Sequence, residues 1–180
     1  MTARFRRRGG AVVARFTAGE ADVLRQMVGD VLDLLGGPEA GTDDPLGGLG
    51  TSPGVPADPA LARLLPDGYR DDPTAAGELR RLTESSLRAD KVRNAQVVLD
   101  GLPASGGSVT LSDEEAQQAW LRALNDVRLA LGTRLDVTED LDLIAEVSAE
   151  PDSTRSYALV VYDWLGWLQE TLIRSVPLGR

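Results

Sequence analysis

Apolar and polar residues alternate along the first sixteen positions, on either side of a central pair of glycines. A period of two is typical of a β-strand with one buried face, and glycine tolerates the positive φ angles of a tight hairpin turn. The pattern therefore predicts a β-hairpin over residues 1–16, with Phe5 opposite Ala14 and Arg7 opposite Val12. Its apolar face should dock on helices, because an isolated hairpin is only marginally stable in water.

After the hairpin the spacing of apolar residues changes to three and four, which is typical of amphipathic helices. Thr17 and Glu20 fit a capping box, in which each side chain bonds a backbone N–H of the other residue. They predict the start of a helix within residues 17–36. Residues 37–57 are rich in Gly, Pro and Asp and show no period, so we expect a loop there that is either flexible or a binding segment.

Two aspartates, Asp58 and Asp72, are each followed by a proline, which suits the first position of a helix. They predict helices over residues 58–102. The polar stretch 83–86 is where a break would fall, so the segment after Asp72 is either one long helix or two collinear helices.

Residues 103–108 are rich in Gly and Ser and predict a loop. Ser112 and Glu115 then fit a second capping box, which predicts a helix within residues 111–135. Residues 136–152 are acidic and show no clean period, so we expect an acidic loop in which Leu141 and Ile144 could form one helical turn.

The last predicted helix, residues 153–176, is apolar around most of its circumference, and its polar stripe is narrow. Such a helix must be central in the fold or shared with a second subunit. Together these elements predict one mainly α domain over residues 1–180, a multi-helix bundle with the N-terminal hairpin docked on it.

Composition agrees with one folded domain: 42% of the 180 residues are hydrophobic and 26% are charged. The chain contains no cysteine and no histidine, which removes disulfides, thiolate sites, the commonest metal ligand and the usual general base. Its carboxylate clusters lack the spacing of a calcium loop. We therefore expect no catalytic residues, no cofactor and no metal. With no signal sequence and no membrane span, we also expect a cytoplasmic protein.

The charge is unevenly distributed. Residues 1–15 contain five arginines and no acid, so with a net charge of −9 the rest of the chain carries about −14 by difference. The acidic body disfavours nucleic acid and anionic membranes as partners. The arginines either pair with acids of the chain's own surface or contact a partner or polyanion; the candidates are Arg4, Arg6, Arg7, Arg8 and Arg15.

Four residues that the helical spacing places in the core could have either a structural or a functional role. Trp120, Trp164 and Trp167 could form an aromatic cage, but core packing is favoured because large aromatics at helical spacing usually supply buried area. For Asp126, which lies in a core-forming helix, a structural ion pair with Arg122 or Arg128 is expected.

Four segments resemble an actinobacterial family of unassigned activity, the domain of unknown function numbered twenty-seventeen: FRRRGGAVVARF, DPALARLLPDGYRDD, AQQAWLRALNDVRLALGTRLDVTED and YDWLGWLQETLIR. The stretch from Trp120 to Leu135 is the most specific. Members of that family are commonly encoded beside the ClpS protease adaptor, and the family includes an actinomycete oxidative-stress regulator. The resemblance implies a regulatory role and supplies no catalytic residues. A thiol switch is excluded in this chain, because it has no cysteine.

From the residues and the resemblance we expect a non-enzymatic regulatory module that binds protein partners, in control of transcription or proteolysis. The alternative is a transcriptional regulator that binds DNA directly with the arginine-rich hairpin. An enzyme ranks third.

The nearly all-apolar last helix also predicts a homodimer, with Leu165, Leu168, Leu172 and Ile173 near the contact. Sedimentation equilibrium at micromolar concentration should then give a mass that rises with concentration above the 19.2 kDa of one chain. A constant mass near one chain would show that a single subunit buries the helix by itself.

Overall fold

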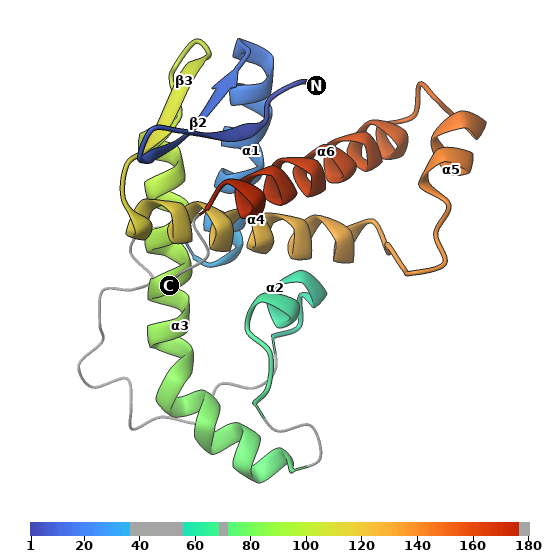
Figure 1. Cartoon of the computed structure of the whole chain (residues 1–180). Coiled ribbons are helices and arrows are strands. Elements are labelled where there is room, and N and C mark those ends of the chain that lie inside the picture. The colour runs from blue at the N-terminus through green and yellow to red at the C-terminus, as the bar shows by residue number, and fades with distance from the viewer. Residues whose placement is uncertain (37–55, 69–71, 177–180) are drawn as a thin grey trace.

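The computed structural model describes residues 1–36, 56–68 and 72–176 (Figure 1). Most of the loop expected at 37–57 lies outside these residues. The elements are β1 (Phe5–Arg8), β2 (Ala11–Phe16), α1 (Ala18–Leu34), α2 (Pro59–Leu64), α3 (Pro73–Gly101), β3 (Gly107–Leu111), α4 (Glu114–Arg134), α5 (Leu143–Ala149) and α6 (Thr154–Ser175). The mainly helical fold with an N-terminal hairpin is confirmed, and no helix of the described residues is long and apolar enough to cross a membrane.

The hairpin has the predicted register, with Phe5 opposite Ala14 and Arg7 opposite Val12. It belongs to a larger sheet than expected, because β3 pairs antiparallel with β2 and gives the order β1-β2-β3. The loop predicted at 103–108 is therefore wrong at its last two residues, where β3 begins. The inward residues of β3, Val109 and Leu111, are buried in the core.

The helix starts follow the side chains that cap them. Thr17 and Glu20 form the predicted capping box of α1, and Asp58 caps α2. The polar stretch 83–86 does not interrupt α3, which is one continuous helix. Its hydroxyls bond backbone carbonyls within the helix: Thr83 donates to Leu79 at 2.8 Å.

Two elements near the acidic segment differ from the predictions. The N-cap of α4 is Asp113, which accepts a hydrogen bond from the backbone N–H of Ala116 at 2.8 Å, so the cap lies one residue beyond the predicted Ser112. The acidic loop expected at 136–152 contains the short helix α5, whose N-cap is Asp142. The seven residues of α5 hold no buried side chain, which is why no core-facing period was visible there.

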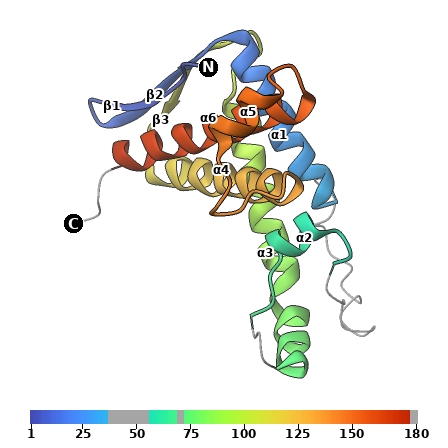
Figure 2. The same cartoon turned by 90° about the vertical axis from the view of Figure 1, so that its right-hand side faces the viewer.

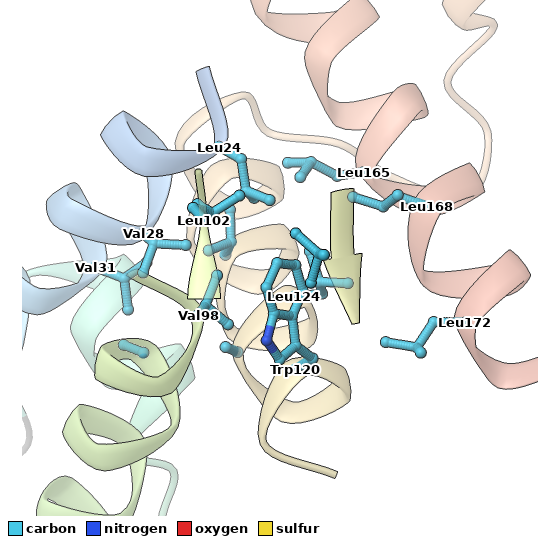
Figure 3. Close-up of a cluster of buried hydrophobic side chains, with 14 of the residues drawn as sticks. Leu24, Val28, Val31, Val98, Leu102, Trp120, Leu124, Leu165, Leu168 and Leu172 are labelled. Atoms are coloured by element: carbon cyan, nitrogen blue, oxygen red, sulfur yellow. The ribbon is translucent and has the colours of Figure 1, made fainter. Parts of the chain in front are cut away.

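The core is centred on Trp120, whose side chain is 0% exposed (Figure 3). The centre of its ring lies 5.6 Å from the centre of the Phe5 ring and 6.2 Å from that of the Phe16 ring. Helix α4 therefore holds the sheet through aromatic contacts. The figure shows leucines of α1, α4 and α6 around the same indole. Trp164 is also buried, but Trp167 is 43% exposed, so the core assignment is wrong for Trp167.

One buried ion pair joins α3 to α4. Asp126 accepts a hydrogen bond from Lys91 at 2.6 Å, and not from Arg122 or Arg128 as predicted. Burial raises the pKa of Asp126, although the bond and charge of Lys91 act in the opposite direction. The pair orients two long helices that cross at the centre of the fold.

Replacing Trp120 or Trp164 by alanine should lower the free energy of unfolding by about 3–5 kcal/mol each, because each truncation leaves a cavity in the core. Urea unfolding monitored by far-UV circular dichroism measures the change. Trp167→Ala is the matched control and should cost about 1 kcal/mol or less, since its ring is partly in solvent. Equal losses in all three variants would contradict this description of the core.

Candidate functional site

Three of the candidate arginines gather on the outer face of the sheet. Arg4, Arg6 and Arg15 line an open hollow of about 540 Å³ whose other walls come from the start of α1 and the turn before β3. We call it the arginine hollow; it is lined by Thr2, Arg4, Arg6, Arg15, Phe16, Thr17, Ala18, Ser105, Gly106 and Gly107. Among the described residues none of these arginines has an ion-pair partner, so pairing with the chain's own acids is not observed there.

The other two candidate arginines lie apart from the hollow. Arg7 points to the opposite face of β1, because it is opposite the buried Val12, and Arg8 lies beside the turn. Both are exposed and, within the part of the chain that the structure describes, neither has an ion-pair partner. The structure thus divides the five arginines into a group of three around one cavity and two separate side chains.

The wall of the hollow depends on Gly106, which has a φ of +80°. A Cβ at this position would lie 2.5 Å from the backbone nitrogen of Ala18, so only glycine lets the turn approach the start of α1 this closely. The close approach fixes the turn against the helix and gives the hollow its depth.

Glu20 holds the N-terminal segment against α1 and so positions Arg4. Its carboxylate accepts hydrogen bonds from the backbone N–H groups of Thr2, Ala3 and Thr17, the last two at 2.9 Å. Burial alone would raise the pKa of Glu20. The backbone bonds, with one from the Thr17 hydroxyl, outweigh burial and lower the pKa from 4.5 to about 2.

A second surface lies where α5 packs on the first half of α6 (Figure 2). Two adjoining hollows of about 530 and 550 Å³ share Leu143 and Asp163, and together they form a groove along α6. We call it the α5–α6 groove. Its apolar lining comes from Leu141, Leu143, Ile144, Val147, Leu159, Val160, Tyr162 and Trp167.

Much of that apolar lining faces solvent. Ile144 is 81% exposed and Val160 is 44% exposed. Acidic groups border them: Asp142 and Asp163 line the groove, and residues 136–152 contain seven acids and no base. Exposed apolar residues bordered by polar groups are typical of a surface that binds another protein.

Two arginines hold the elements around the groove together, and one of them, Arg128, also lines it. The Arg128 guanidinium lies 5.2 Å from the centre of the Tyr162 ring and donates a hydrogen bond to Gln169 at 2.8 Å. Arg155 donates to Glu146 at 2.7 Å and to the Leu135 carbonyl, which ties α5 to the end of α4. The Arg155 contact holds α5 beside α6 although α5 buries no residue of its own.

The predicted dimer residues lie elsewhere. Leu165, Leu168 and Leu172 are fully buried within one chain, in contact with the sheet and α4, so they have no surface left for a second copy. The opposite side of α6 carries the exposed residues, Ile173 among them. The placement of these three leucines at a dimer contact is therefore wrong, because β1 and α4 cover their side of α6.

The sequence reasoning missed the α5–α6 groove because it treated residues 136–152 as a loop. The available signal was Asp142 as an N-cap followed by Leu143, Ile144 and Val147 at helical spacing. Within the described ranges, no group of three or more acidic residues is arranged to hold a metal ion.

Comparison with known proteins gives a consistent result. A family model described as "Domain of unknown function (DUF2017)" matches residues 1–176. The AosR protein of Mycobacterium leprae is 36% identical over 177 residues, which cover 87% of this chain and 78% of the relative. The protein named oxidative stress regulator AosR in Mycobacterium tuberculosis is 34% identical over 176 residues, 86% of this chain and 77% of the relative. No solved structure gives a significant match.

Glu20→Gln should lower the free energy of unfolding by up to about 3 kcal/mol at pH 7, because the native carboxylate is stabilised relative to the unfolded one. The native pKa lies below the unfolded value, so this contribution is present above pH 4.5 and is lost as pH falls toward 2. Urea unfolding at pH 7, 4 and 3 measures the free energy of unfolding of wild type and variant. The difference between the two should become smaller as the pH falls. A difference that stays constant over this range would contradict the role of the charge.

Proposed function

The chain belongs to the DUF2017 family, and from that premise we propose that it is a regulatory protein that acts by binding a protein partner in the α5–α6 groove. The relatives reported above carry the name oxidative stress regulator, with "putative" before it in Mycobacterium leprae, which supports a regulatory role. The chain has neither histidine nor cysteine, so a binding role makes fewer demands on its side chains than catalysis does.

The observation that carries the proposal is the exposure of Ile144 and Val160 in a concave surface. A monomer in water gains nothing from holding these side chains in solvent, whereas a partner that covers them gains hydrophobic free energy. Because α5 contributes no side chain to the core, it can adjust its position on binding at little cost.

The chemistry of the groove indicates the kind of partner. Its length follows α6, its floor is apolar, and its border carries Asp142 and Asp163. An amphipathic helix fits this surface when apolar residues at positions i, i+3, i+4 and i+7 face the floor and Lys or Arg residues face the acids. We propose that the partner presents such a basic amphipathic helix, and that it takes part in control of transcription or proteolysis.

Direct DNA binding is the second candidate, and the cluster of Arg4, Arg6 and Arg15 favours it. Phosphate contacts by these side chains would make binding steeply dependent on salt. An electrophoretic shift at two salt concentrations, with wild type and an Arg4, Arg6, Arg15→Glu triple variant, tests it. If the wild type and variants of the α5–α6 groove bind DNA and the triple variant does not, direct DNA binding becomes the first candidate.

The groove is tested with a fluorescent helical peptide of about 14 residues that has leucines on one face and lysines on the other. We expect saturable binding by anisotropy, and at least a tenfold weaker affinity for Ile144→Lys and for Val160→Lys. Each substitution removes apolar contact and adds a charge that repels the lysines.

The matched control is Leu82→Lys, which changes an exposed leucine of α3 outside the groove in the same way. It should leave affinity within twofold of wild type. A second control peptide has the same composition in an order that spreads the leucines around the helix, and should bind at least tenfold more weakly. Equal loss in all three variants, or equal binding of both peptides, would reduce the interaction to nonspecific charge attraction and overturn the proposal.

A further inference from the structure

We propose that the arginine hollow is a binding site for a small ligand that carries two or more phosphate groups. This site is separate from the α5–α6 groove and does not depend on the function proposed there. The evidence is the convergence of Arg4, Arg6 and Arg15 on one cavity, from the residue before β1 and from the neighbouring strands β1 and β2.

The arrangement is electrostatically unfavourable without an anion. Arg4, Arg6 and Arg15 line one cavity, and like charges that share a small volume repel one another. No carboxylate of the described residues pairs with them, although the whole chain has a net charge of −9. An anion with several charges would relieve the repulsion among all three groups at once.

Guanidinium groups select the chemistry of that anion. Each presents a planar set of N–H donors that matches two oxygens of a phosphate, and three of them match the charge of a di- or triphosphate. The backbone start of α1 at Ala18 borders the same cavity and adds the positive end of a helix dipole. Glu20 does not line the hollow, and its carboxylate oxygens accept hydrogen bonds from the backbone N–H groups of Thr2, Ala3 and Thr17.

The size and lining of the hollow favour a compact ligand recognised through its phosphates. A volume of about 540 Å³ falls within the roughly 300–1,000 Å³ of small-molecule sites. The one aromatic residue in the lining, Phe16, is buried in the core, so no exposed ring is available to stack on a nucleobase. The class is therefore an oligophosphate or the phosphate chain of a nucleotide.

The backbone around the hollow is fixed by several contacts. β2 is the central strand of the sheet, Gly106 fixes the turn against α1, and Glu20 fixes the segment that leads to Arg4. Phe5 donates a backbone hydrogen bond to Thr171 of α6 at 3.1 Å, which also anchors β1. A fixed backbone keeps the three arginines on one surface, which lowers the entropy that binding costs.

The test is isothermal titration calorimetry of the full chain with inorganic tripolyphosphate, followed by a nucleoside triphosphate and by a DNA duplex of about 20 base pairs. We expect one site for tripolyphosphate, and at least a tenfold weaker affinity for Arg6→Gln and for Arg15→Gln. Both side chains are exposed, so both variants should keep the wild-type melting temperature.

Arg7→Gln is the matched control, since it removes the same charge from the same strand but on the face away from the hollow. It should bind within twofold of wild type. A tenfold loss of affinity in Arg7→Gln as well would mean that the ligand is attracted by positive charge in general, and it would overturn the proposed site. Binding of the duplex without binding of tripolyphosphate or the nucleotide would also overturn it, and would favour the DNA-binding function.

Discussion

The packing of the Trp120 indole against Phe5 and Phe16 joins the two parts of this molecule, because it attaches the sheet to the helical body. The sheet has three short strands, and the helical body covers its apolar face. Its inward side chains enter the same cluster as the leucines of α1, α4 and α6. Once those side chains are committed to the core, the strand period of two places Arg4, Arg6 and Arg15 on the outer face. The core thus determines where the basic surface lies.

The same helix α6 separates two surfaces of opposite charge. Its second half packs against β1, beside the basic sheet, and its first half packs against the acidic α5 (Figure 1). Separation of this kind lets one domain bind a basic partner at one end and an anion at the other without competition between them.

The sequence predicted the elements that depend on local signals. The capping box at Thr17, the aspartate cap of α2 and the hairpin register all follow from residues within a few positions of each other. It did not predict contacts between distant segments. β3 pairs with β2 across about ninety intervening residues, and a short strand between two glycines and a helix cap resembles a loop. Likewise, Lys91 and Asp126 meet only because α3 and α4 cross.

The same limit applies to the candidate surfaces. The sequence points to all five arginines as candidates. It does not show which of them share a cavity, because the hollow is completed by a turn near residue 106. For α6, an apolar circumference fits both internal burial and a dimer interface, and only the observed cover by sheet and helices shows that Leu165, Leu168 and Leu172 are internal. The exposed residues on the other side of α6 form the groove with α5.

Hydrogen–deuterium exchange with and without the basic amphipathic peptide tests the central claim, that α5 and α6 receive a protein partner, most directly. Because α5 buries no residue, its amides should exchange quickly in the free protein and slow at least tenfold in the complex, while the amides of β1 and β2 stay unchanged. Protection of the sheet with no change in α5 would contradict the account.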